Sequence, residues 1–141
     1  MTSSSPASTR VHDTSRSPGL LRTALTLDAA ITGANGAAYL VAAPVLHDLL
    51  GPPVGALRAV GAFLLVFAAV VWFVGSRSTI SLRAAGVVVA VNLVWVIDSL
   101  AAAALGWGSP TTIGTVWIVL QAAVVSGLAA LQWTGIRRAR G

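Results

Sequence analysis

The chain has 141 residues, of which 56% are hydrophobic and 9% are charged, and its mean hydropathy is +0.84. An average soluble domain is about one quarter charged, and a domain this small leaves much of its surface in water. The composition therefore excludes an ordinary soluble enzyme and a disordered chain. It predicts an integral membrane protein.

The charged residues are restricted in kind as well as in number. All nine basic residues are arginine, all four acidic residues are aspartate, and cysteine is absent. Together with the many Ala, Gly, Val and Leu residues, this bias is typical of GC-rich coding and predicts a bacterial source. The lack of cysteine excludes disulfides, thiolate metal sites and cysteine nucleophiles. Because the arginines lie beside apolar segments, membrane topology explains the net charge of +5, and no nucleic-acid partner is expected.

The chain divides into three parts by composition. Residues 1–22 are rich in Ser, Thr, Pro and Arg and predict a disordered cytoplasmic tail. Residues 23–135 predict a four-helix transmembrane domain, and residues 136–141 a basic cytoplasmic tail. The first apolar stretch is too long for a cleaved signal peptide, whose apolar region has about 7–15 residues, so we interpret it as a retained helix.

Four apolar stretches account for the transmembrane domain. A hydrocarbon core about 30 Å thick needs about 20 helical residues, and a backbone inside lipid must satisfy its own hydrogen bonds. We therefore predict an all-α polytopic membrane protein with four transmembrane helices in two hairpins. The predicted spans are about 23–46, 56–75, 83–105 and 112–135.

The arginines predict the orientation of these spans. Eight of them fall on one side of the predicted topology, and only Arg58 falls on the other. Because cytoplasmic loops carry an excess of basic residues, both termini should be cytoplasmic in a multi-pass protein of the plasma (inner) membrane. The eight arginines are Arg10, Arg16, Arg22, Arg77, Arg83, Arg137, Arg138 and Arg140.

The first apolar stretch carries a polar stripe. Asp28, Thr32, Asn35 and Tyr39 fall on one helical face, beside a row of small residues that begins at Ala29. An ionisable residue within a membrane helix is a functional candidate. In one interpretation, Asp28 exchanges a proton and lines a route for cations or protons. In the other, Asp28 lies about 10 Å from the centre of its segment and pairs with an arginine near the interface, either Arg22 or Arg83.

Arg58 and Asp98 are the other charges within predicted spans. Their depths differ by about 6 Å at 1.5 Å per residue, which an arginine side chain can bridge. We expect a structural ion pair between the second and third helices, with substrate binding by one of these charges or outward extension of Arg58 as alternatives.

Asn92 and Gln121 lie in the middle of the third and fourth spans. Amide side chains at this depth form interhelical hydrogen bonds or line a small cavity, and the sequence leaves both alternatives open. Gln121 shares a helical face with Trp117 and Gln132. Asn92 and Asp98 are about 120° apart around their helix, so they cannot both face one narrow pore.

No enzyme motif, metal site or cofactor site is present in the sequence. The H-E-x-x-H, G-x-S-x-G and G-x-x-x-x-G-K patterns are absent. His47 and Asp48 are adjacent in the outer connection, whereas His12 is expected on the opposite side, so they lack the further ligands that a metal needs. We expect a protein without catalytic, metal-binding or cofactor-binding residues.

Two resemblances bear on function. The segment Leu27 to Leu40 looks like the first helix of small, uncharacterised four-helix integral membrane proteins of high-GC bacteria, and Trp117 to Trp133 looks similar too. That resemblance implies only fold and location. The chain also resembles the small multidrug resistance transporters in its length, its four helices and the placement of Asp28. That family uses Glu at this place, and this chain has none.

The leading functional expectation is a non-enzymatic assembly or interaction protein, in contact with the lipid bilayer and with a second copy or another membrane protein. Rows of small residues on the first and fourth helices motivate it. The alternative is a small proton-coupled transporter of cationic compounds that uses Asp28. A third expectation is that the arginines of residues 1–22 contact anionic lipid.

Overall fold

The computed structural model describes residues 18–141 and contains five helices in that range. Residues 1–17 of the predicted disordered tail, which include Arg10, His12 and Arg16, lie outside the described residues. The helices are α1 (Pro18–Val41), α2 (Ala43–Leu50), α3 (Val54–Ser76), α4 (Leu82–Leu105) and α5 (Thr112–Arg140).

The first predicted span differs from the structure at both ends. The helix begins at Pro18 rather than at residue 23 and ends at Val41, and α2 follows at an angle of 96°. Pro44 explains the break, because it has no backbone N–H to donate to the carbonyl of Leu40 and its ring would clash there. His47 and Asp48, predicted in a connection, lie on α2. At its other end the chain continues as α5 to Arg140, so most of the predicted basic tail is helical.

Three helices, α3, α4 and α5, are each long and apolar enough to cross a membrane. The α1–α2 pair meets the same criterion only as one bent unit, which brings the number of candidate spans to as many as four. The chain is thus an all-helical bundle with several membrane-spanning candidates, as the composition predicts.

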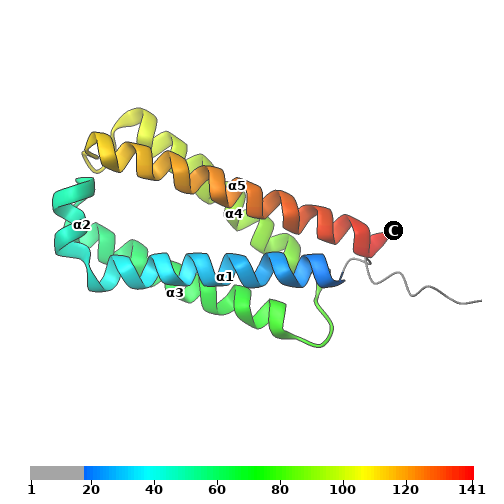
Figure 1. The fold of residues 1–141 in the computed structure, drawn as a ribbon. Helices are drawn as coiled ribbons and strands as arrows, with labels where there is room; N and C mark the ends of the chain where they lie inside the picture. The colour runs from blue at the N-terminus through cyan, green and yellow to red at the C-terminus, as the bar shows by residue number, and fades with distance from the viewer. Residues whose placement is uncertain (1–17) are drawn as a thin grey trace, which may run out of the picture.

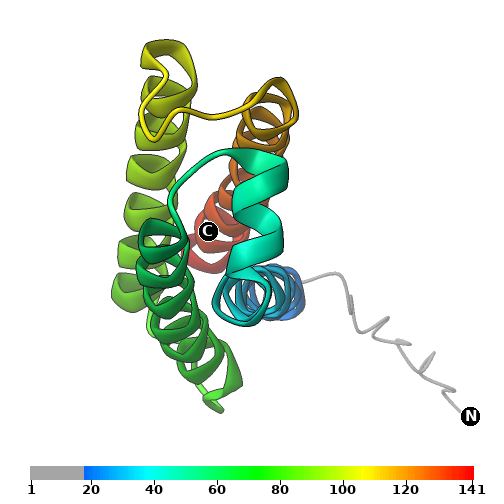
Figure 2. The same ribbon diagram turned by 90° about the vertical axis from the view of Figure 1, so that its left-hand side faces the viewer.

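The long helices form two packed pairs, α1 with α3 and α4 with α5, and α1 also packs on α5. Figure 1 shows α1 and α5 close together near the C-terminus and farther apart toward α2. The short helix lies across the ends of the long helices on that side (Figure 2). We call the region around Leu21, Asp28 and Gln132 the narrow end, and the region around Tyr39, Trp117 and α2 the wide end.

Small residues allow the closest helix contacts. A side chain at Gly36 would lie 2.8 Å from the carbonyl oxygen of Gly61, and one at Gly135 would lie 2.9 Å from the Cα of Leu21. Part of the predicted row of Ala29, Gly33 and Ala37 is used within the chain, because Ala29 is buried and Gly33 packs on α3. The predicted row on α5, which consists of Ala122, Ser126 and Ala130, keeps Ser126 and Ala130 exposed. Assembly with a partner stays a prediction.

Polar contacts fix both ends of the bundle. At the narrow end, the guanidinium of Arg22 donates hydrogen bonds to the carbonyl oxygens of Gly75 (2.6 Å) and Arg77 (2.9 Å), where α3 ends. A cation is favourable at this position because the last carbonyls of a helix carry partial negative charge. At the wide end, Thr111 donates from its hydroxyl to the Leu49 carbonyl (2.7 Å) and from its backbone N–H to that of Leu50 (2.9 Å). These bonds tie α2 to the start of α5.

Candidate functional site

Asp28 is the centre of a buried polar cluster that joins three helices. Its side chain is 0% exposed. One carboxylate oxygen accepts hydrogen bonds from the amide nitrogens of Asn92 (2.7 Å) and Gln132 (2.6 Å), and the other accepts from the hydroxyl of Thr32 (3.0 Å). The Asn92 amide nitrogen also lies 3.3 Å from the amide oxygen of Gln132. The cluster therefore links α1 to α4 and α5 through neutral donors.

The expected arginine partner of Asp28 is not there. Arg22 is committed to the carbonyls at the end of α3, and Arg83 is exposed. Asp28 lies six residues, about 9 Å along the helix axis, from Arg22, whose guanidinium reaches the end of α3 instead. Within residues 18–141, no basic side chain contacts the carboxylate. In the ionised form of Asp28, the negative charge would be balanced only by the dipoles of these donors.

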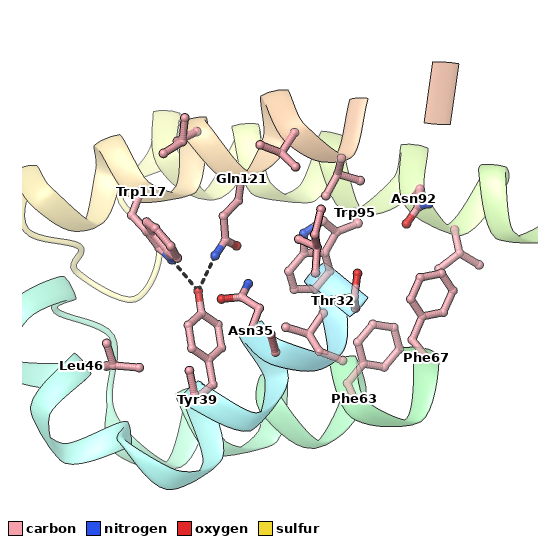
Figure 3. A pocket seen from close by; sticks show the side chains of 18 residues that line it. Thr32, Asn35, Tyr39, Leu46, Phe63, Phe67, Asn92, Trp95, Trp117 and Gln121 are labelled. Atoms are coloured by element: carbon pink, nitrogen blue, oxygen red, sulfur yellow. Dashed lines mark hydrogen bonds between the residues drawn. The ribbon is translucent and has the colours of Figure 1, made fainter. Parts of the chain in front are cut away.

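A second polar group connects α1 to α5 at the wide end. The Tyr39 hydroxyl accepts hydrogen bonds from the indole N–H of Trp117 (3.0 Å) and from the side-chain amide of Gln121 (3.2 Å). Tyr39 is buried, while Trp117 and Gln121 are partly exposed. Figure 3 shows the hydroxyl between these two side chains, which reach toward it across the space between the helices.

A cavity of about 560 Å³ lies between the two polar groups and is lined from all five helices. This volume falls in the range of small-molecule sites in proteins. Its walls are mainly apolar and aromatic, and the described residues that line it include no charged side chain. The aromatic and polar lining residues are Thr32, Asn35, Tyr39, Phe63, Phe67, Asn92, Trp95, Trp117 and Gln121.

Aromatic rings form the wall where α3 faces α4. Phe63 stacks on Phe67, with ring centroids 6.2 Å apart, and on Trp95 of α4, with centroids 6.1 Å apart. The two helices have few other contacts, so this stack is the main boundary of the cavity on that side. The π-faces of such rings attract cations.

Thr32 and Asn92 belong to both the Asp28 cluster and the cavity wall. The carboxylate itself is not a lining residue, since these two side chains separate it from the cavity. Figure 3 places Asn92 at the opposite end of the cavity from Trp117. Whatever occupies the cavity would therefore contact the neighbours of Asp28 rather than Asp28 itself.

The structure separates Arg58 and Asp98 from this site. Both side chains are exposed, and no ion pair joins them among the described residues, so the expected structural pair is wrong. The physical reason is the sparse packing between α3 and α4, which leaves these two charges without a shared interface. The predicted 120° between Asn92 and Asp98 agrees with the structure, because Asn92 is buried and Asp98 is not.

Of the predicted candidates, five gather around the cavity and its adjoining cluster, namely Asp28, Asn35, Tyr39, Asn92 and Gln121. Gln132 was not among the predicted candidates, although its side-chain amide donates a hydrogen bond to Asp28. Its signal was present in the sequence, because Gln132 follows Gln121 by three helical turns and both therefore lie on one face of α5.

No family model, curated protein or solved structure matches this chain. Both resemblances drawn from the sequence therefore stay predictions.

Proposed function

We propose that the chain is a four-span protein of the bacterial plasma membrane that binds lipophilic aromatic cations inside the bilayer and exchanges them for protons. The observation that carries the proposal is the aromatic-walled cavity of about 560 Å³ beside a fully buried carboxylate that no basic side chain contacts within residues 18–141.

The chemistry of the cavity favours a cation. An ionised carboxylate in a low-dielectric interior is costly unless a positive charge lies nearby, and neutral hydrogen bonds compensate it only in part. Aromatic faces such as those of Phe63 and Trp95 add an attraction for a cation that has lost its water. A lipophilic cation in the cavity would supply the missing positive charge at short range.

Proton exchange follows from the same charge balance. When the cavity is empty, a proton on Asp28 removes the cost of the buried charge, and when a cation binds, the proton is no longer needed. Proton release and cation uptake are then thermodynamically linked, and each weakens the binding of the other. In this proposal Asp28 acts as the shared site of charge compensation.

The placement of arginines supports the proposed topology. In the fold, Arg77 and Arg83 border the α3–α4 connection at the same end as Arg22 and the C-terminal arginines, whereas Arg58 lies near the start of α3 at the other end. By the positive-inside rule, the arginine-rich end would face the cytoplasm, with both termini there. The bent α1–α2 unit then counts as the first span, with α2 near the outer surface.

The test is proton flux in proteoliposomes that contain the full chain and are loaded with a lipophilic aromatic cation. We expect an outward cation gradient to drive proton uptake in the wild type. Asp28→Asn should abolish this flux, because the amide keeps the size of the side chain but cannot exchange a proton. Asp98→Asn, the same chemical change at an exposed site, is the control and should leave the flux unchanged. Equal flux in the wild type and in Asp28→Asn would refute the proposed role of Asp28.

A further inference from the structure

We infer that the ligand of this cavity is an aromatic amine in its protonated, N–H-bearing form, and that its N–H donates to the side-chain oxygen of Asn92. The inference rests on the proposed function and narrows its ligand class. It also assigns Asn92 as the contact residue, with Asp28 as a positioning residue that acts through it.

The hydrogen bonds of Asn92 leave one atom free. Its amide nitrogen lies between two acceptors, the carboxylate of Asp28 (2.7 Å) and the amide oxygen of Gln132 (3.3 Å), which fixes the nitrogen on the cluster side. The amide oxygen accepts no hydrogen bond from the described residues. Asn92 as a whole is only 3% exposed. Its amide oxygen is nevertheless not fully buried, because every fully buried side-chain nitrogen or oxygen among the described residues has a hydrogen-bond partner. Since Asn92 lines the cavity, the cavity is the open space next to this oxygen.

Asp28 makes this oxygen a strong acceptor. A carboxylate that accepts a hydrogen bond from an amide N–H polarises the amide, and the polarisation increases the negative charge on its carbonyl oxygen. In a low-dielectric site this effect is larger than in water. Asp28 does not contact the cavity, but through this hydrogen bond its negative charge makes the cavity-facing oxygen of Asn92 more negative.

Thr32 strengthens the preference for an N–H donor. Its hydroxyl hydrogen is used by Asp28, at an O–O distance of 3.0 Å, so the hydroxyl oxygen can only accept toward the cavity that Thr32 lines. The narrow-end wall of the cavity thus offers acceptors, from two side chains held by the same carboxylate. A quaternary ammonium ion has no N–H to give them and would leave the Asn92 oxygen unpaired.

The rest of the cavity fits an aromatic body. The rings of Phe63, Phe67 and Trp95 provide flat apolar walls next to Asn92. At the far end, the side chain of Asn35 makes no hydrogen bond within the described residues, and Gln121 uses only its amide nitrogen, so polar groups remain there for a substituent. The cavity therefore fits a molecule with a protonated amine at one end and a polar group at the other.

The experiment compares two cations that differ only at nitrogen. Binding of N-methyl-1-naphthylmethylammonium and of its trimethylammonium analogue to the full chain in detergent is measured by equilibrium dialysis at neutral pH. Both ligands carry one positive charge and the same ring system. We expect the secondary amine to bind the wild type at least about tenfold more tightly than the trimethyl analogue. The reason is that a hydrogen bond from a charged donor contributes at least as much free energy as a tenfold change in affinity corresponds to.

The variant Asn92→Leu should reduce amine affinity to the level of the trimethyl analogue and leave binding of that analogue little changed. A folded Asn92→Leu protein that keeps the amine preference would overturn the inference. If this variant does not fold, the relative affinity of the wild type for the two cations still tests the N–H assignment. Equal or tighter binding of the trimethyl analogue by the wild type would overturn the N–H assignment while the proposed function stands. Binding of neither cation would overturn both.

Discussion

The narrow and wide ends of the bundle differ in the surroundings of their polar side chains. At the narrow end, Asp28, Asn92 and Gln132 bond to one another beneath an apolar core that draws on four helices. At the wide end, Tyr39 reaches Trp117 and Gln121 across open space, while Asn35 has no partner within the described residues. In lipid, a polar atom that the protein itself satisfies, such as the amide nitrogen of Asn92, holds helices together. A polar atom left free beside the cavity, such as the amide oxygen of Asn92 or those of Asn35, is available to a ligand.

The two ends also differ in how closely the helices approach. Near Leu21 the backbone of α1 meets α5 with only Gly135 between them. Toward α2, contact between α1 and α5 depends on long side chains that cross a cavity of about 560 Å³. For the contact between α1 and α5, the contrast predicts that mutations at the narrow end reduce stability more than mutations at the wide end, which should change ligand binding more than stability.

Among changes in the α1–α5 contact, the largest stability effect should come from Gly135→Ala. A Cβ there would lie 2.9 Å from Leu21 Cα, so the helices must separate, and we expect a loss of about 1–3 kcal/mol. Gly127→Ala is the matched control on the same helix, because nothing lies within 4 Å of the new Cβ. It should be neutral or stabilise by up to about 1 kcal/mol through helix propensity. Unfolding of the detergent-solubilised chain measures both, and similar losses in the two variants would show that the narrow end is not closely packed.

A smaller effect is expected from Tyr39→Phe. The change removes the acceptor for Trp117 and Gln121 but keeps the ring. Since interhelical hydrogen bonds in membrane proteins average about 0.6 kcal/mol, the loss should be about 1 kcal/mol or less. Affinity for an aromatic cation should change as well, because both freed donors line the cavity. A loss of stability larger than that of Gly135→Ala would reverse the proposed ranking of the two ends.

The sequence predicts the helices better than it predicts their neighbours. Length and apolarity were sufficient for α3, α4 and α5, because a membrane span needs about 20 apolar residues. The bend before α2 was missed, since apolar residues continue through Pro44 and hydropathy does not register the lost backbone hydrogen bond.

The site was predictable one helix at a time. The periodicity of α1 placed Asp28, Thr32 and Tyr39 on one face, and the structure brings all three to the cluster or the cavity. Periodicity within a helix does not say which other helix faces it. For that reason the pairing of Asp28 with Asn92 and Gln132 was not predicted, and a pairing of Arg58 with Asp98 was expected where α3 and α4 scarcely touch.

The most direct test of an open wide end and a closed narrow end uses single cysteines, since the chain has none of its own. Asn35→Cys places the only thiol in the cavity wall, and Ala29→Cys places it in the core beside Asp28, where Ala29 is 6% exposed. A small cationic methanethiosulfonate reagent should modify the folded Asn35→Cys protein, and a bound aromatic cation should slow that reaction. Ala29→Cys should react only after denaturation. Equal rates at the two positions, or no protection of Asn35→Cys by the cation, would contradict the account.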